Sequence, residues 1–212
     1  MIDARWPNEA VIRPSGVYMK LTLGRWGVVD YDTWLAIREN RWHAHSSKRT
    51  CYCQRLSRTD DSGHVWVLLH RVVAKARVGE QVDHVNGDGL DNRKSNLRVC
   101  TQRQNMANKG SHKGKYRGVS CYSKDGGKYH ARIFRSVGKK LSTSCGRYTC
   151  EHAAARAWDA GALLVYDAEF IRLNNPPQCG CEECKAAPAK GEAAARRLLD
   201  RLANFDTTQP TK

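Results

Sequence analysis

The residues of this chain best suited to chemistry are Asp83 and His84, a carboxylate and an imidazole side by side. The apolar residues Val82 and Val85 flank this pair, so the pair is expected near the end of a β-strand. Neighbouring side chains of a strand point to opposite faces. One of the two can therefore bind a ligand while the other acts on it.

The residues after this pair predict a compact unit of strand, turn, strand and helix. Residues 86–89 contain an Asn-Gly and an Asp-Gly pair, which favour positive φ and a tight reversal. Residues 97–101 alternate as a returning strand. A short helix over residues 102–108 is expected to carry Asn105 on its surface, which completes a ββα unit.

The polar positions over residues 83–108 resemble the HNH nuclease motif of phage and intron homing endonucleases. The matching pattern is Asp-His, Asn-Gly-Asp, Asp-Asn-Arg, Ser-Asn-Leu-Arg and Asn-Met-x-Asn. In that family a ββα unit holds one divalent metal ion against the scissile phosphate. The resemblance implies that His84 is the general base, that Asp83 and Asn105 bind the metal, and that Asn96 braces the loop presenting the base.

These roles fit the chemistry of the side chains. A neutral imidazole can take a proton from water at neutral pH. Carboxylate and amide oxygens suit a hard cation such as Mg²⁺, with Mn²⁺ as the alternative.

A shorter match would indicate much less. Asn-Gly-Asp alone indicates a turn, and an adjacent Asp-His pair is common by chance. No hairpin needs Asn96, Asn105 and Asn108 at these positions, and a structural helix favours Ala, Leu or Glu over Asn. A DNA-binding regulator with an inactive HNH unit is the alternative, and the intact set of Asp83, His84, Asn96 and Asn105 argues against it.

The charge of the chain indicates a polyanionic partner. Its 212 residues include 36 Lys and Arg against 21 Asp and Glu, a formal net charge of +15. Double-stranded DNA is the leading candidate. An RNA-binding module is a weaker alternative, since neither an aromatic RNP pattern nor a KH loop is present.

The same composition gives expectations for location. The sequence has no run of about 18 apolar residues that would predict a membrane span. Residues 1–10 lack the apolar core of a signal peptide. We therefore expect a protein of the cytoplasm, the host cell's if a phage encodes it, without an obligate protein partner.

Nine cysteines exclude a fully paired disulfide framework in a monomer and fit a reducing compartment. Cys179, Cys181 and Cys184 have a spacing that suits zinc. A fourth ligand is missing nearby in the sequence, so we expect no zinc here, only solvent-facing thiols ahead of a helix over residues 189–205. This tail, residues 176–212, is expected to be dispensable for cleavage.

Residues 1–69 predict a β-rich module, because residues 18–23 alternate with period 2, and a helix is expected to begin near residues 30–32. The module also resembles, more loosely, the strand-rich lead-in of phage homing endonucleases. Residues 41–49 are basic and bear histidines, which indicates a solvated loop that could touch phosphate.

The HNH unit is expected over residues 70–110, after a strand at residues 65–69. His70 begins a helix there and could either approach the substrate phosphate or be structural. Three basic residues flank the returning strand and are predicted to bind DNA: Arg93, Lys94 and Arg98.

A glycine-bearing basic linker at residues 109–114 precedes a second unit over residues 115–175. Its pattern predicts a three-stranded sheet, with a hairpin turn at residues 125–127, backed by one helix over residues 150–166.

This second unit resembles the APETALA/ERF-type DNA-binding domain through Tyr-Arg-Gly-Val, Lys-Tyr-His-Ala-Arg-Ile, Ala-Ala-Arg-Ala-Trp-Asp and the closing residues 170–174. In that family the sheet lies in the major groove. Plant members usually have tryptophan where Tyr129 stands, so no base preference is carried over. The resemblance implies that five residues contact DNA: Arg117, Tyr122, Lys128, Tyr129 and Arg132.

Charge supports a DNA-binding role for this segment independently of the resemblance. Residues 109–140 hold ten Lys and Arg against Asp125 alone. A sheet with a purely structural role would be expected to show mixed signs.

The sequence thus predicts an α+β protein with a β-rich N-terminal module, a ββα-metal HNH unit, and a three-stranded sheet plus helix that binds DNA. Together these parts imply a site-directed, metal-dependent DNA endonuclease of the homing type.

Overall fold

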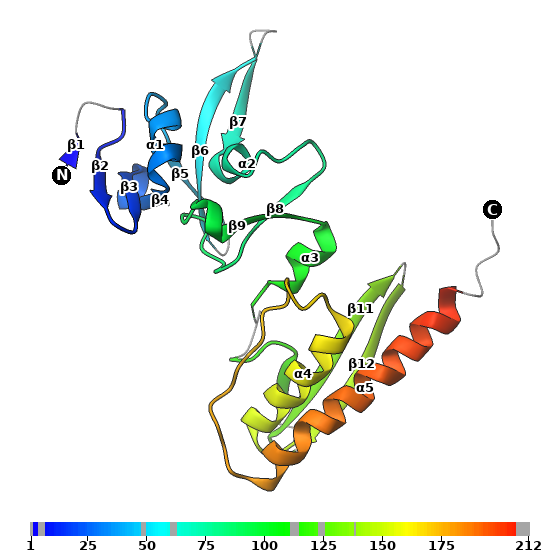
Figure 1. Cartoon of the computed structure of the whole chain (residues 1–212). Coiled ribbons are helices and arrows are strands. Elements are labelled where there is room, and N and C mark those ends of the chain that lie inside the picture. The colour runs from blue at the N-terminus through cyan, green and yellow to red at the C-terminus, as the bar shows by residue number, and fades with distance from the viewer. Residues whose placement is uncertain are drawn as a thin grey trace. The chain divides into compact units, whose positions relative to one another are not determined.

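The computed structural model describes residues 2–3, 7–47, 50–59, 63–110, 115–122, 126–137 and 139–206, without the side chains of residues 2–3, 136–137, 139–140 and 204–206. The chain folds into two compact units, Met1–Met106 and Ala107–Lys212. Both combine small antiparallel sheets with helices (Figure 1). The finer division into four parts at residues 69, 110 and 175 stays a prediction.

A four-stranded antiparallel sheet opens the first unit, with its strands in sequence order: β1 (Ile2–Asp3), β2 (Ala10–Arg13), β3 (Gly16–Lys20) and β4 (Trp26–Val29). The pleat of β3 turns Val17 and Met19 into the core, as the period-2 pattern predicts. A 3₁₀ turn, η1 (Thr22–Gly24), precedes β4, and helix α1 (Tyr31–Ile37) follows it.

A second antiparallel sheet follows: β5 (His43–Ser46), β6 (Cys51–Arg58) and β7 (His64–Leu68). The expectation of a solvated loop over residues 41–49 was therefore wrong for His43–Ser46, because these residues pair with β6. Lys48 and Arg49 lie outside the described residues. Both sheets share one apolar core, which includes Met19, Trp34, Cys53 and Leu69.

The stretch with the polar motif contains five short elements: α2 (Leu69–Val73), β8 (Gln81–His84), η2 (Lys94–Asn96), β9 (Leu97–Cys100) and α3 (Gln102–Ala107). β8 and β9 form a two-stranded antiparallel sheet, and α3 begins two residues after β9 ends. The order of strand, turn, strand and helix is the one that the sequence predicts.

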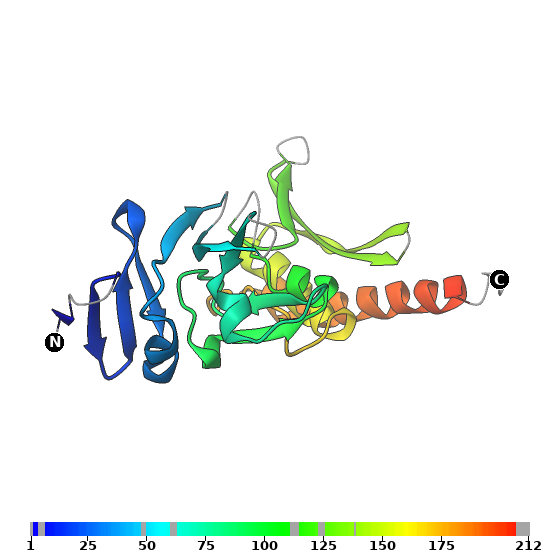
Figure 2. The same ribbon diagram turned by 90° about the horizontal axis from the view of Figure 1, so that it is seen from above.

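The second unit has a three-stranded antiparallel sheet and two helices: β10 (Val119–Tyr122), β11 (Lys128–Val137), β12 (Lys139–Tyr148), α4 (Glu151–Val165) and α5 (Glu182–Asp206). Figures 1 and 2 show both helices beside the long β11–β12 hairpin. Ala131 and Ile133 of β11 are buried in the same core as Trp158 of α4 and Leu198 of α5. The sheet is therefore backed by two helices, where the sequence predicts one.

Helix α5 is longer than predicted and is not a peripheral tail. It begins at Glu182, before the predicted residue 189, and continues through Pro188. Ala187, Ala194 and Leu198 are fully buried in the core of the unit. The side chain of Phe205, predicted to share this apolar stripe, lies outside the described residues.

The two helices approach closely at a pair of glycines. A Cβ on Gly191 would lie 1.9 Å from the carbonyl oxygen of Ala157, and a Cβ on Gly161 would lie 2.6 Å from the carbonyl oxygen of Gly191. Neither position can hold a side chain without moving backbone. The small residues of α4 therefore allow close packing against α5 as well as against the sheet.

In the described part of the chain, no helix is both long enough and apolar enough to cross a membrane.

Candidate active site and nucleic-acid interface

Asp83 and His84 lie at the end of β8, and both side chains are buried. In the pairing with β9, Asp83 is opposite Arg98 and His84 is opposite Leu97. Because consecutive residues of a strand face opposite ways, the two side chains have different neighbours.

His84 belongs to a cluster of three rings. Its ring centroid is 5.1 Å from that of His70, which begins α2, and 5.9 Å from that of Tyr52 in β6. The rings of Tyr52 and His70 are 5.5 Å apart. Two other elements of the first unit, β6 and α2, thus contact the imidazole of His84, and the structure places His70 against it.

Burial favours the neutral form of both imidazoles. It lowers the pKa of His84 below the ordinary value of 6.5, although a hydrogen bond with Asn92 and nearby carboxylates, Asp83 first, oppose the shift. Burial and the neighbouring His84 lower the pKa of His70 to about 4. Among the described residues the Nδ1 atom of His70 has no hydrogen-bond partner.

Asp83 is held by Arg98 from the neighbouring strand. The Nη2 and Nε atoms of Arg98 donate to the Oδ2 atom of Asp83 at 2.7 and 2.8 Å. The amide of Asn105 in α3 donates to Gln81 Oε1 at 3.4 Å. Gln81 and Asp83 are two residues apart in β8 and share a face, so Asn105 lies over the face that carries Asp83.

Asn96 connects the two sides of the loop after β8. Its Oδ1 atom accepts the backbone N–H of Asn86 at 3.0 Å, and its Nδ2 atom donates to Asn86 Oδ1 at 3.0 Å and to the carbonyl of Asp91 at 2.8 Å. Its own carbonyl accepts the N–H of Val85. This one side chain thereby fixes both ends of the turn that follows His84.

Hydrogen bonds also join the same loop to Cys53 of β6 and to Thr50, the residue that precedes β6. The N–H of Gly89 donates to Thr50 Oγ1 at 3.0 Å, and the buried amide of Asn92 donates to Cys53 Sγ at 3.4 Å. A Cβ on Gly89 would lie 2.4 Å from the carbonyl oxygen of Cys51, so only glycine fits this close approach. The loop is therefore packed against the sheet that carries Tyr52.

The predicted DNA contacts of the first unit are engaged in ion pairs within the protein. The guanidinium of Arg93 contacts both carboxylate oxygens of the buried Asp91, at 2.6 and 2.8 Å. Lys94 pairs with Asp32, and Arg98 pairs with Asp83. Each of these three cations would have to share its carboxylate partner with a phosphate, and their contact with DNA stays a prediction.

A family model for HNH endonucleases matches residues 67–107. Neither a curated protein nor a solved structure matches the chain. The HNH match begins near the end of β7 and ends with α3, so it contains His70, Asp83, His84, Asn96 and Asn105. The predicted resemblance to HNH nucleases is confirmed over this segment, and it supports a nuclease activity.

A second set of candidate residues lies on the face of the β10–β12 sheet that points away from α4 and α5. Lys128 and Arg132 are exposed on this face of β11, and Tyr122 is exposed opposite Lys128 on β10. Phe134 is exposed on the same side of β11. The sheet therefore presents cations and aromatic rings together, a combination suited to phosphates and bases.

Two predicted contacts of this sheet point elsewhere. Tyr129 faces the helices and packs against their core, because it alternates with Lys128. The guanidinium of Arg117 lies 5.0 Å from the ring centroid of Trp158 and 5.6 Å from that of Tyr166. Both side chains contact the core of the unit and do not lie on the exposed face, and their contact with DNA stays a prediction.

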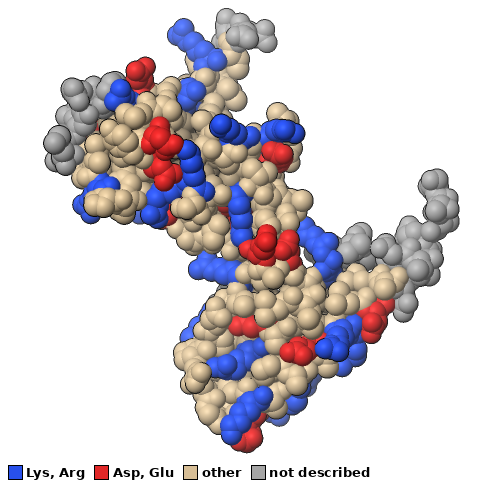
Figure 3. Space-filling model, viewed as in Figure 1, with Lys and Arg blue, Asp and Glu red and all other residues tan. Residues whose placement is uncertain are grey.

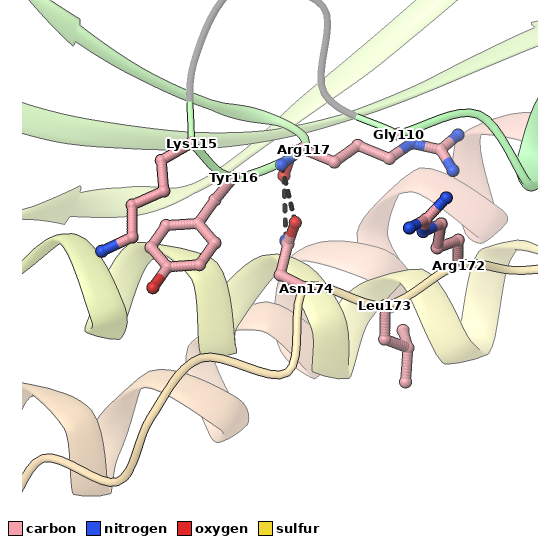
Figure 4. Close-up of a pocket in the computed structure, with 7 residues that line it drawn as sticks. All are labelled: Gly110, Lys115, Tyr116, Arg117, Arg172, Leu173 and Asn174. Carbon is pink, nitrogen blue, oxygen red and sulfur yellow. Dashed lines mark hydrogen bonds between the residues drawn. The ribbon is translucent and has the colours of Figure 1, made fainter. Parts of the chain in front are cut away.

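Arg117 also borders a shallow pocket of about 300 Å³ (Figure 4). Asn174 accepts the N–H of Arg117 at 2.6 Å and donates to its carbonyl at 3.1 Å, which fixes the closing segment against the start of the sheet. Lys115 and Arg172 also line this pocket.

Two residues near the candidate sites, Arg147 and Tyr52, were missed by the sequence analysis. Arg147 is exposed on β12 opposite His130, so it shares the outer face of the sheet. The alternation in residues 139–148 is the signal that could have identified it. Tyr52 carries no such signal, since its approach to His84 depends on the packing of two separate sheets.

Figure 3 shows Lys and Arg on the visible face of both units, in keeping with the net charge of +15.

Proposed function

We propose that this protein is a metal-dependent endonuclease that cleaves double-stranded DNA at sites selected by its second unit. The observation that carries the proposal is the division of β8, within the HNH match, into one face with the enclosed imidazole of His84 and another with the carboxylate of Asp83.

His84 acts as the general base in this proposal. Its lowered pKa leaves the imidazole neutral at neutral pH, so it can accept a proton from the attacking water. His70 and Tyr52 pack around the ring and limit its orientation. Asn96 acts as a positioning residue, because its three hydrogen bonds hold the loop that follows the base.

Asp83 and Asn105 are the proposed ligands of a divalent cation, most simply Mg²⁺ with Mn²⁺ as the alternative. The donor set fits, since one carboxylate and one amide oxygen lie over the same face of β8 and Mg²⁺ keeps most of its waters. A bound ion would supply positive charge to the departing 3′ oxygen. Arg98 would then exchange part of its contact with Asp83 for a contact with phosphate.

The outer face of the β10–β12 sheet is the proposed DNA-binding surface, in the manner of the APETALA/ERF-type domain. Lys128, Arg132 and Arg147 supply charge for the phosphates, and Tyr122 supplies an exposed ring. This role for the sheet, together with the HNH match, supports a site-directed enzyme of the homing type.

A DNA-binding regulator with an inactive HNH scaffold is the second candidate. The ion pair between Arg98 and Asp83 favours it, because the arginine neutralises the carboxylate that the metal needs. The two candidates predict the same DNA affinity but opposite results in a cleavage assay.

The deciding experiment incubates the full chain with supercoiled plasmid, with Mg²⁺, with Mn²⁺ and with excess chelator. The nuclease predicts nicked or linear product only in the presence of metal, and loss of that product in Asp83→Ala. Tight DNA binding without cleavage under both metals would instead establish the regulator.

A further inference from the structure

Four cysteines of the second unit bring their sulfur atoms together. They come from two segments separated by helix α4, and every pair of their Sγ atoms lies within 4.8 Å: Cys150, Cys179, Cys181 and Cys184. Cys184 is buried and the other three are half-buried. The expectation of solvent-facing thiols without a fourth ligand was wrong, because the fold supplies Cys150 from the N-cap of α4.

The spacing of the sulfur atoms fits a tetrahedral zinc ion. Zinc–sulfur bonds of about 2.3 Å place the sulfurs of a tetrahedral site about 3.8 Å apart. The Sγ atoms of Cys150 and Cys184 are 3.7 Å apart. A disulfide would need about 2.05 Å, so these two sulfurs are not bonded to each other, and their separation fits two ligands of one ion.

Hydrogen bonds that involve no sulfur atom hold together the two segments that carry the four cysteines. The carboxylate of Glu183 accepts the N–H of Cys150 at 2.9 Å, and it accepts the N–H and hydroxyl of Thr149 at 3.0 Å each. The N–H of Cys184 donates to the carbonyl of Cys181 at 3.0 Å. The end of β12 and the start of α5 are thereby fixed side by side.

The charge around the cluster also suits thiolates. Four thiolates and one Zn²⁺ carry a net charge of −2, and binding would release the four thiol protons to solvent. Arg156 and Lys185 line a pocket together with Cys179 and Cys184. Cys150 and Cys184 stand at the N-terminal ends of α4 and α5, where the helix dipoles favour negative charge.

We propose that Cys150, Cys179, Cys181 and Cys184 form a structural zinc site that fastens α5 to the sheet and to α4. The site belongs to the second unit and is separate from the residues of the HNH match. Its ligands leave no open coordination position, so its role is to stabilise the fold.

The first test measures zinc in the full-length protein, purified with a thiol reductant and without added metal. We expect about one zinc per chain. Cys150→Ser and Cys181→Ser should each lose it. Cys121→Ser, which removes an exposed cysteine of β10, is the matched control and should retain it, as should Asp83→Ala.

A second measurement needs no variant. Replacing zinc by Co²⁺ in the wild-type chain should give the thiolate-to-cobalt charge-transfer band and the intense visible bands of a tetrahedral sulfur site. The proposal is overturned if the wild-type chain binds neither metal, if Cys150→Ser retains full zinc, or if the four cysteines are joined in disulfides in protein isolated without reductant.

Discussion

At the residue scale, β8 shows how two neighbouring side chains obtain opposite properties. His84 faces His70 and Tyr52, while Asp83 faces the guanidinium of Arg98. The alternation itself follows from the sequence, because period 2 is a property of every strand. The neighbours of His84 could not be predicted from the sequence. Tyr52 and His70 belong to other elements and reach His84 only through tertiary packing.

His70 provides a prediction for stability. In the unfolded chain, His70 takes up a proton as the pH falls below about 6.5. In the folded protein, burial lowers the pKa of His70 to about 4, so the proton is taken up only at lower pH. The contribution of the neutral imidazole to stability is therefore complete above the pKa of the unfolded chain. It is lost as the pH falls from about 6.5 to about 4. The difference corresponds to roughly 3 kcal/mol in the free energy of unfolding.

Urea unfolding at neutral pH and near pH 4 checks this prediction. His70→Gln should lose much less stability on acidification than the wild type does. His64→Gln, which changes an exposed histidine of β7, should behave like the wild type. An equal loss in His70→Gln and wild type would show that other groups dominate the acid response.

At the element scale, the close approach of α4 and α5 organises the second unit. Gly191 lies with its Cα against the backbone of Ala157, and Leu198 continues the contact into the core. The apolar spacing of α5 was visible in the sequence, but its target was not. Small residues at helical spacing do not reveal whether a sheet or another helix will cover them.

Gly191→Ala tests this crossing. The added methyl group would meet the carbonyl oxygen of Ala157 at 1.9 Å, so the helices must separate. Overpacking of this kind typically costs about 1–3 kcal/mol and sometimes more. Thermal unfolding should therefore show a lower midpoint. Gly110→Ala is the control, because nothing lies within 4 Å of its added carbon, and an unchanged midpoint in both variants would contradict the packing described here.

The strands of the second unit illustrate what patterns can and cannot predict. Lys128 and Arg132 were predicted from the resemblance to the APETALA/ERF-type domain, and both are exposed on β11. Arg117 was predicted from the same resemblance, which does not determine where a side chain points, and its guanidinium lies near the ring of Trp158. The turn expected at residues 125–127 falls partly outside the described residues, at Asp125.

At the scale of the whole molecule, a net charge of +15 and two separate compact units are consistent with one unit that cuts and another that binds. The sequence could predict the HNH segment because its polar residues are close together in the chain. It could not predict the cysteine cluster, because α4 separates Cys150 from Cys179, Cys181 and Cys184 in the chain and the four meet only in the fold.

The charge of the sheet leads to a prediction for DNA affinity. A plot of log affinity against log salt concentration has a negative slope. Each phosphate contact that is removed should reduce the magnitude of this slope by about 1. Arg132→Ala and Lys128→Ala should each show this change in duplex binding, followed by fluorescence anisotropy over a series of salt concentrations. Arg196→Ala, which removes an exposed charge from α5, should keep the wild-type slope. If all three variants kept the wild-type slope, the sheet would be ruled out as the DNA-binding surface.

The central claim, that His84 activates the water for metal-dependent cleavage, is tested most directly by single-turnover cleavage of duplex DNA with Mg²⁺ by wild type and His84→Ala. Loss of a general base should lower the rate by roughly 10²- to 10⁴-fold. DNA binding, measured on the same samples, should stay unchanged because His84 is buried in the first unit, whereas the proposed DNA-binding residues belong to the second. Cleavage by His84→Ala at the wild-type rate would contradict the account.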